Sequence, residues 1–456
     1  MTRLFGTDGI RGIANQYPII PEVGMGLGRA VVAYCRQGGM EPSVVIGRDT
    51  RDSGQMLAFA VATGVLSAGG RAYMAGVLPT PGVAYLVRHF RAGAGVVLSA
   101  SHNPHEYNGF KLFSANGFKL SEREEDRIEE MIRAPEKYPQ GGPPGRAEVE
   151  EDGWQLYLGF LGKTVPGDRP LKGIRLVIDC ANGATFQVAP KLFERLGATV
   201  KTLFAEPDGK NINKECGSQH PEALQEEVLR TGAAAGLAFD GDGDRLVAVD
   251  ETGTVLSGDQ IIALCARDLK EQGRLKNDLV VSTVMSNMGL RFALQDMGIE
   301  HIATRVGDRS VMEAMKEKGA MLGGEDSGHI IFMDQHTTGD GIVSALQLLC
   351  AQLRAQKPLS EMRQIMTIFP QALINVPVSR KPVMASIPEI GAVIQQVEQA
   401  LAARGRVLVR YSGTEPLCRV MVEGENRDDV ERYAREIAET IQAFLGYSNS
   451  SDSSAG

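Results

Sequence analysis

The sequence predicts an α/β protein of several domains that ends in a small α+β unit. The chain has 456 residues, 43% of them hydrophobic, which is too long for one compact domain and long enough for several cores. Runs of β-branched residues alternate with helix-like stretches, the pattern of β-α-β units in mostly parallel sheets. From about residue 370 this alternation stops and a different order of elements begins.

The predicted strands of the α/β part are short apolar runs, and a polar or glycine-rich loop follows each one. They cover residues 43–47, 95–100, 175–180, 236–240 and 278–284, and residues 53–69 form a typical helix between two of them. Ligands of α/β proteins bind at the carboxyl ends of such strands. We therefore expect functional residues in the loops after the strands.

Two proline-rich or irregular stretches, 135–147 and 355–364, mark boundaries because proline breaks helices and strands alike. The last part reads strand 371–378, helix 386–405, strands 406–412 and 418–424, and helix 427–445. We expect α/β domains at 1–150, 151–254 and 255–367, an α+β domain at 368–447, and a disordered polar tail at 448–456.

Composition excludes several classes of protein. No stretch approaches the roughly 18 apolar residues of a membrane span, and the first residues, MTRLFGTDG, lack the apolar core of a signal peptide, so we expect a cytoplasmic protein. A net charge of -8 disfavours a nucleic-acid surface, and an anionic substrate would need a local basic cleft. Six scattered cysteines predict buried free thiols.

The segment DGDGDR, residues 240–245, places Asp240, Asp242 and Asp244 at alternate positions between two predicted strands. Three carboxylates separated by glycines can face one hard cation, so we predict a magnesium site. An Asp-Gly turn without metal is the simpler alternative. A calcium EF-hand is excluded, because its sixth position needs glycine and holds Arg245, and because strands flank the loop.

The segment SASHNP, residues 99–104, follows the buried run at 95–98 and contains Ser101 beside His102, with Lys111 a little further on. Taken alone, this composition is more typical of a turn than of a nucleophile. A histidine or lysine close to a hydroxyl can move its proton or neutralise phosphate charge, which favours the functional interpretation.

Two further glycine loops are candidates for binding. GGEDSGH, 323–329, carries Glu325, Ser327 and His329, and is either a sugar-binding loop or a simple turn. RYSGTEP, 410–416, combines hydroxyl groups and a glycine turn with an arginine, and could hold phosphate or form a hairpin. No ATP motif is supported, because the P-loop-like LGKT at 161–164 lacks its first glycine, and no dinucleotide motif is supported, because GMGLGRA at 24–30 is not G-x-G-x-x-G.

These motifs together resemble those of the α-D-phosphohexomutase family, and within it the bacterial branch that acts on glucosamine phosphate. The resemblance covers nearly the whole chain. The motifs that carry it are FGTDGIRG (5–12), SASHNP, NGFKLFSANGFKL (108–120), DGDGDR, GEDSGHIIFMDQHTTGDG (324–341) and RYSGTEPLCRVMVEG (410–424).

The resemblance implies four domains around a central cleft and assigns a role to each motif. Ser101 would carry a phosphoryl group and, with the three aspartates, hold one Mg²⁺; His102, Lys111 and His329 would act in catalysis. The residues implied in substrate binding are Arg11, Arg245, Glu325, Ser327, Arg410, Ser412, Gly413, Thr414 and Arg419.

The implied reaction interconverts glucosamine 6-phosphate and glucosamine 1-phosphate, for UDP-N-acetylglucosamine synthesis, through a phosphoserine and a bisphosphorylated sugar. Glucose or glucosamine 1,6-bisphosphate would be the activator, and a homodimer is possible. Asp326, where glutamine is usual in this branch, leaves the sugar preference open, so a phosphomannomutase or phosphoglucomutase is the alternative. A non-catalytic sugar-phosphate-binding protein is a more distant one, because the serine and all three aspartates are present.

Overall fold

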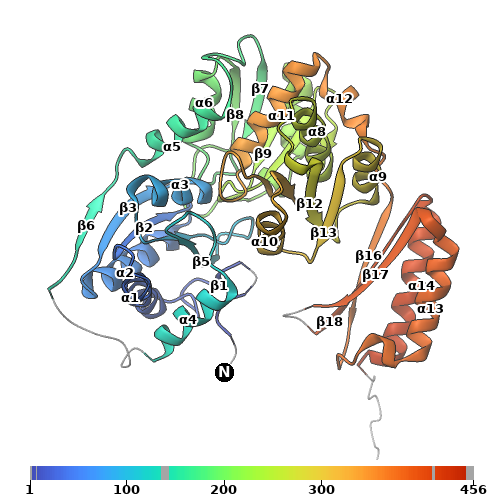
Figure 1. The fold of residues 1–456 in the computed structure, drawn as a ribbon, viewed down its shortest axis with the longest axis horizontal. Coiled ribbons are helices and arrows are strands. Elements are labelled where there is room, and N and C mark those ends of the chain that lie inside the picture. The colour runs from blue at the N-terminus through green and yellow to red at the C-terminus, as the bar shows by residue number, and fades with distance from the viewer. Residues whose placement is uncertain (1–2, 7, 135–142, 413–415, 448–456) are drawn as a thin grey trace, which may run out of the picture. The chain divides into compact units, whose positions relative to one another are not determined.

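The computed structural model describes residues 3–6, 8–134, 143–412 and 416–447. The chain divides into two compact units, one of residues 1–286 with 293–366 and one of residues 287–292 with 367–456. The described residues form four sheets, of which the first three belong to the larger unit and the fourth to the smaller one (Figure 1). The prediction of three α/β sheets and a separate C-terminal α+β unit is confirmed.

The first sheet has the order β1-β5-β4-β2-β3-β6. Its strands are β1 (Ile10–Ile13), β2 (Ser43–Arg48), β3 (Arg71–Val77), β4 (Ala94–Leu98), β5 (Tyr107–Ser114) and β6 (Arg146–Val149), and its helices are α1 (Pro21–Gln37), α2 (Asp52–Ser67), α3 (Thr80–Phe90) and α4 (Glu122–Arg133). Strands β2, β3, β4 and β6 are parallel, whereas β5 runs antiparallel to β4 and β1. Because the chain moves from β2 to β3 and then back across β2 to β4, right-handed crossovers place α2 and α3 on opposite faces.

The second sheet has the order β11-β10-β9-β7-β8. Its strands are β7 (Arg175–Asp179), β8 (Thr199–Leu203), β9 (Ala235–Phe239), β10 (Leu246–Asp250) and β11 (Val255–Leu256), with helices α5 (Gly153–Leu161), α6 (Val188–Arg195) and α7 (Glu222–Thr231). Strands β9 and β10 pair antiparallel, with Phe239 opposite Leu246. The segment 240–245 is therefore the turn of a hairpin at the carboxyl end of β9.

The third sheet has the order β13-β12-β14-β15. It contains β12 (Leu279–Thr283), β13 (Glu300–Thr304), β14 (Leu322–Gly324) and β15 (Ile330–Phe332), with α8 (Gly258–Glu271), α10 (Asp308–Lys318), α11 (Gly341–Ala355) and α12 (Leu359–Met362). The segment 325–329 joins β14 to the antiparallel β15, so this loop too is the turn of a hairpin. Helix α9 (Met288–Asp296) is divided between the two units.

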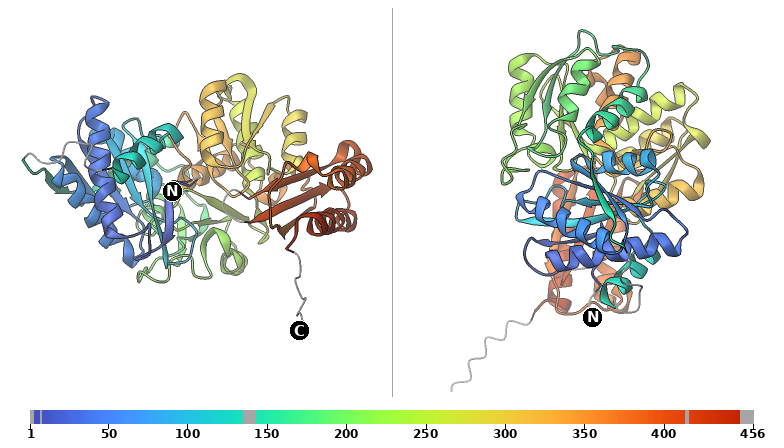
Figure 2. Two further views of the ribbon diagram at one scale, coloured as in Figure 1. Left: turned by 90° about the horizontal axis from the view of Figure 1, so that it is seen from below. Right: turned by 90° about the vertical axis from the view of Figure 1, so that its left-hand side faces the viewer.

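The smaller unit has a three-stranded antiparallel sheet of order β16-β18-β17. Its elements are β16 (Gln371–Pro377), α13 (Pro388–Leu401), β17 (Gly405–Tyr411), β18 (Leu417–Gly424) and α14 (Arg427–Leu445), in the order that the sequence predicts. Alternate strand residues such as Ile374, Val409 and Val420 form one core with both helices, which therefore cover the same face of the sheet (Figure 2).

Burial explains why the strands read as apolar runs. Residues 94–98 of β4 and 235–239 of β9 are buried throughout, as expected for strands covered on both sides. All six cysteines are free and buried, which confirms that prediction. Within the described ranges, no helix is both long and apolar enough to pass through a lipid bilayer.

Candidate active site

Ser101 lies at the turn that follows β4, and its side chain is only 1% exposed. Its backbone has φ = 54°, a left-handed conformation that costs a serine about 1–3 kcal/mol and is kept only when the surroundings fix it. The surroundings do so here: its N–H donates to Oγ of Ser99 at 2.9 Å, and its carbonyl accepts from Arg51 and Asn213, each at 2.9 Å. The backbone of Ser101 is thus held in one place.

Arg51 is the main support of this loop and is fully buried. Its guanidinium pairs with Asp49 at 2.8 Å and also donates to the carbonyls of Asn103, at 2.8 Å, and Pro104. Asp49 in turn accepts from the hydroxyl of Ser99 at 2.6 Å. One ion pair therefore organises the backbone on both sides of Ser101.

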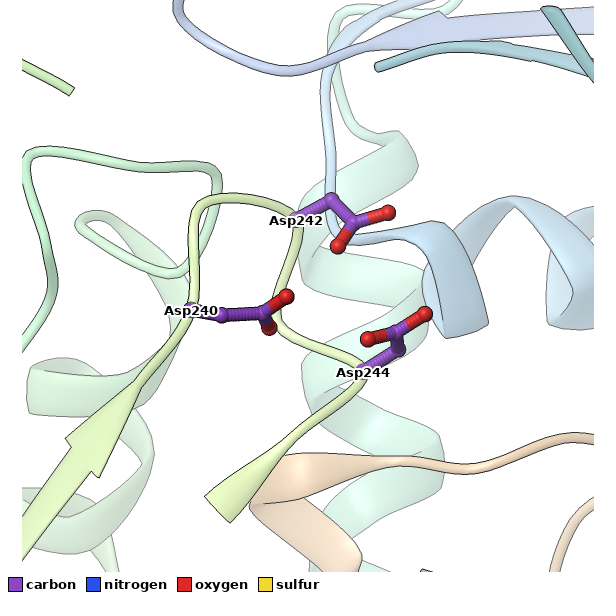
Figure 3. A group of neighbouring side chains, drawn as sticks. All are labelled: Asp240, Asp242 and Asp244. Carbon is purple, nitrogen blue, oxygen red and sulfur yellow. The ribbon is translucent and has the colours of Figure 1, made fainter. Parts of the chain in front are cut away.

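The three aspartates of the β9–β10 turn face one another, as Figure 3 shows. One carboxylate oxygen from each of Asp240, Asp242 and Asp244 lies within 4.8 Å of the others, and all three residues are buried. The hydroxyl of Ser101, from the first sheet, donates to Oδ2 of Asp240 at 2.5 Å. The structure therefore brings the serine and the three aspartates into one site.

The electrostatics of this group fit a divalent cation. Oδ1 of Asp242 and Oδ1 of Asp244 are buried, and neither accepts a hydrogen bond from any residue that the structure describes. Burial and the two neighbouring carboxylates raise the pKa of Asp240 well above its usual value. Mg²⁺ prefers carboxylate oxygens as ligands. A cation between the three aspartates would therefore bind the unpaired oxygens and reduce the repulsion between the carboxylates.

Lys111, on β5, is the cation beside this group. Its ammonium lies 2.7 Å from Asp242, 3.2 Å from Asp244 and 3.2 Å from Asp8. Burial alone would lower the pKa of Lys111, but the three surrounding carboxylates raise it well above its usual value. The lysine is therefore charged at neutral pH.

His102 differs from Lys111 in charge. Its Nδ1 lies 3.4 Å from Oγ of Ser101 and 3.1 Å from a guanidinium nitrogen of Arg245. Because that nitrogen can only donate, Nδ1 of His102 is the acceptor. Burial, reinforced by the charge of Arg245, lowers the pKa of His102 to about 4, so the ring is neutral at pH 7.

His329, on the loop between β14 and β15, lies between two acids. Its Nδ1 is 3.7 Å from Asp244 and its Nε2 is 3.8 Å from Asp308. Burial would lower the pKa of His329, but Asp244 and then Asp308 raise it above its usual value. A side chain at Gly339 would come within 2.4 Å of the ring, so this position needs glycine.

The same loop carries Glu325 and Ser327. Oε1 of Glu325 accepts from the backbone N–H of Gly307 at 3.1 Å, which ties the loop to the start of α10. Ser327 is exposed. Arg11, on β1, pairs with Asp8 next to Lys111.

Three charged residues beside Lys111 and His329, namely Asp8, Lys119 and Asp308, were missed by the sequence reasoning. Lys119 pairs with both Asp8 and Asp308 and so joins the first sheet's domain to α10. Asp8 and Lys119 lie in the motifs FGTDGIRG and NGFKLFSANGFKL, but nothing in the sequence shows that their charges meet. Asp308 is the first residue of α10 and follows β13, and neither element was predicted there from the sequence.

The smaller unit contains the last predicted site residues. Arg410 on β17 and Arg419 on β18 are directly opposite in the strand register, and burial together with the charge of Arg419 lowers the pKa of Arg410. Lys381 donates to the carbonyl of Ser412 at 2.6 Å, which adds a third cation that the sequence did not suggest. Gly413 and Thr414 lie outside the described residues.

Known proteins resemble this chain over nearly its full length. The four domains described for phosphoglucomutase/phosphomannomutase match residues 2–139 (domain I), 157–253 (domain II), 257–369 (domain III) and 373–440 (the C-terminal domain). Phosphoglucosamine mutase of Syntrophus aciditrophicus is 51% identical over 98% of this chain and 100% of its own length. The phosphoglucosamine mutase of a Thermoanaerobacter species is 50% identical with the same coverage.

Solved structures agree on the fold. A phosphoglucomutase/phosphomannomutase family protein of Burkholderia thailandensis has a TM-score of 0.79 at 24% identity and covers 97% of each chain. N-acetylphosphoglucosamine mutase of Aspergillus fumigatus, solved with GlcNAc-6P and magnesium, has a TM-score of 0.70 at 16% identity and covers 96% of this chain and 95% of its own. With relatives about half identical over 98% of its length and all four domains matched in order, the chain belongs to the phosphoglucomutase/phosphomannomutase family.

Proposed function

We propose that this mutase interconverts glucosamine 6-phosphate and glucosamine 1-phosphate. The observation that carries the proposal is the buried hydroxyl of Ser101 next to Asp240 and the two other aspartates, in a chain half identical to phosphoglucosamine mutases. Ser101 would carry the phosphoryl group, pass it to the sugar to give a bisphosphorylated intermediate, and take back the phosphoryl group from the other end. The product would serve UDP-N-acetylglucosamine synthesis.

Asp240, Asp242 and Asp244, with an oxygen on Ser101, would hold one Mg²⁺. The ion would neutralise the negative charge of the phosphoryl group, because phosphoryl transfer depends mainly on positioning and charge stabilisation. The A. fumigatus relative solved with magnesium is consistent with this cofactor. The residues of this chain supply the remaining functions.

Charge and proton transfer divide between different side chains. Lys111, charged among three carboxylates, would neutralise a phosphoserine, which has nearly two negative charges, rather than accept a proton. His102, neutral and 3.4 Å from the hydroxyl of Ser101, and His329 are the candidates that can move a proton near Ser101. Arg245 would add a second cation, since it contacts both His102 and Asp244.

Recognition of the sugar would rest on Glu325 and Ser327, whose oxygens can bind ring hydroxyls. Arg11 would contact the substrate from the first domain. The substrate's other phosphate would bind the smaller unit through Arg410, Ser412, Gly413, Thr414 and Arg419. Opposed arginines favour a phosphate because an anion between them relieves their mutual repulsion.

We further propose glucose or glucosamine 1,6-bisphosphate as the activator that phosphorylates Ser101. A variant of the A. fumigatus enzyme was solved in complex with glucose 1,6-bisphosphate, which supports such a ligand in a related site. The proposal includes a cytoplasmic location, a possible homodimer, and no nucleic-acid or membrane partner. The proposed substrates of the enzyme are small sugar phosphates.

The test is the mass of the intact purified protein, with peptide mapping, before and after glucose 1,6-bisphosphate and Mg²⁺. We expect one phosphoryl group on Ser101 that leaves when glucosamine 6-phosphate is added, and none in a Ser101→Ala variant. Comparing kcat/KM for glucosamine, glucose and mannose phosphates then tests the sugar; a higher value for mannose or glucose would overturn the preference. No phosphate on Ser101 under any condition would favour a binding protein instead.

A further inference from the structure

The two carboxylate oxygens of Asp242 have different surroundings. Oδ1 is buried and accepts no hydrogen bond within the described part of the chain. Oδ2 accepts two, one from the ammonium of Lys111 at 2.7 Å and one from the hydroxyl of Thr80 at 2.5 Å. The carboxylate is thus held by one oxygen, and the other is left for a ligand.

Thr80 belongs to a different domain from Asp242. It is the first residue of α3, which packs on the first sheet, whereas Asp242 lies in the hairpin turn of the second. Its side chain is fully buried, and its backbone N–H also donates to the carbonyl of Asp242 at 2.9 Å. Two hydrogen bonds therefore join Thr80 of α3 to Asp242 of the β9–β10 turn, residues 240–245, which we call the metal loop.

The neighbours of Thr80 restrict how it can move. Prolines at 79 and 81 have fixed φ, and a threonine side chain is stiff at χ1 because it is branched. Pro79 also packs against the metal loop, where a side chain at Gly243 would come within 3.2 Å of it. Gly243 has φ = 73°, so the loop needs glycine there for its backbone as well. The hydroxyl of Thr80 is aimed at Asp242 by a rigid segment.

Lys111 cannot fix the direction of Asp242 in the same way. Its ammonium is shared with Asp244 and Asp8, and a lysine ammonium is a rotating point charge on a flexible chain. A threonine hydroxyl donates a single directional hydrogen bond. Thr80 therefore adds a directional constraint on the Asp242 carboxylate that the shared ammonium of Lys111 does not supply.

We propose that Thr80 is a positioning residue for the metal site, which turns Oδ1 of Asp242 toward the cation and keeps it there. The inference rests on the metal site of the proposed function and adds to it a residue from outside the aspartate loop. Partners that orient metal ligands typically change metal affinity by about 10- to 100-fold when removed. Loss of the Thr80 hydroxyl should act on affinity for the ion rather than on the chemical step.

The test measures Mn²⁺ binding to the full-length, metal-free protein by electron paramagnetic resonance of free Mn²⁺. We expect Thr80→Val to weaken Mn²⁺ binding by about 10- to 100-fold, and Thr80→Ser, which keeps the hydroxyl, to stay within about threefold of the wild type. At saturating metal, Thr80→Val should recover most of the wild-type kcat. If Thr80→Val does not fold, Thr80→Ala serves for the same comparison with Thr80→Ser.

Thr50 offers a matched control. It is another buried threonine of the first domain, and its hydroxyl donates at 2.6 Å to the carbonyl of Asn182 in the second rather than to an aspartate of the metal loop. Thr50→Val should leave Mn²⁺ binding unchanged. Equal binding by Thr80→Val and wild type, an equal loss in Thr80→Ser, or an equal loss in Thr50→Val would each overturn the role of Thr80. No Mn²⁺ binding by the wild type would instead overturn the metal site itself.

Discussion

The hydroxyl oxygen of Ser101 lies 2.5 Å from Oδ2 of Asp240, although the two residues follow strands of different sheets. This contact joins the proposed phosphoryl carrier to one of the proposed metal ligands. The charge of Asp240 has two opposite effects. It would help to bind the cation, but without a cation burial and the neighbouring carboxylates make it unfavourable.

Replacing Asp240 with asparagine should therefore change stability and activity in opposite directions. In metal-free buffer the variant should melt at a higher temperature than the wild type. Burial, Asp244 and Asp242 raise the pKa of Asp240, so its ionised form destabilises the folded protein, and asparagine removes this ionisation. In the presence of Mg²⁺ its activity should fall by about 100-fold or more, since a ligand is lost. Melting curves with and without chelator, and Mg²⁺ titrations of activity, provide the measurement.

Glu226→Gln is a suitable control for Asp240→Asn, because it removes an exposed acid on α7 of the same sheet. It should leave both quantities unchanged. A lower melting temperature for metal-free Asp240→Asn would show that the carboxylate charge is stabilised by its surroundings rather than strained.

Arg51→Met should destabilise the protein strongly. It leaves Asp49 buried and unpaired, and breaking a buried ion pair costs about 3–5 kcal/mol. A double variant with Asp49→Asn should regain part of this loss, because no charge then remains. Calorimetric melting of the wild type, the single variant and the double variant tests the prediction, which fails if the double variant is no more stable than the single one.

The buried His336 predicts a pH dependence of stability. Its Nε2 donates to the carbonyl of Pro81 at 3.0 Å and its Nδ1 accepts from Thr337 at 2.7 Å, and burial lowers the pKa of His336 to about 4. A histidine whose folded pKa is lowered stabilises the protein above its unfolded pKa, near 6.5, and this contribution is lost as the pH falls toward 4.

His336→Gln removes that titration. The variant should be less stable than the wild type at pH 7.5, and the difference should narrow by about 1 kcal/mol per pH unit between pH 6.5 and 4.5. Asp340, 4.0 Å from the ring, is present in both proteins, and burial raises its pKa to about 6. Urea denaturation at several pH values measures the free energy of unfolding of both proteins. If the difference between wild type and variant stays constant or widens on acidification, His336 is not held neutral in the folded protein.

Arg410→Gln should weaken substrate binding. If the opposed arginines hold the non-reacting phosphate, loss of one charge should raise KM by roughly 10-fold at low salt, and less at high salt. Arg404→Gln, which removes a surface arginine paired with Glu425 in the same unit, is the matched control and should leave KM unchanged. Steady-state kinetics at two ionic strengths decide the matter; an unchanged KM in Arg410→Gln would exclude the phosphate role.

Much of the fold could be predicted because its signals are local. The buried runs that form β2, β4, β7, β9 and β12 and the strand-helix order of the smaller unit depend on short-range patterns of apolar residues. The same local patterns could not predict that β5, β10 and β15 run antiparallel to their neighbours. Their direction depends on hairpin turns, and those turns were singled out for their chemistry rather than their geometry.

The site was predictable where chemistry is concentrated in one segment and not where it depends on contacts between segments. The three aspartates are adjacent in sequence, so their convergence follows from the turn. Thr80 and Lys119 act on residues more than a hundred positions away, and each has an ordinary sequence context. Arg51 is similar, since only the fold shows that its guanidinium supports the backbone of Ser101.

The convergence of the three larger sheets has a consequence for synthesis of the chain. Ser101, the aspartate turn and His329 leave the ribosome in that order, far apart in time, because each belongs to a different sheet. A nascent chain that has completed only the first sheet holds the serine without its aspartates, and one that has completed the second lacks the histidine. A chain truncated before residue 329 would therefore contain only part of the proposed site, because its phosphoryl carrier, its metal ligands and His329 come from three successive sheets.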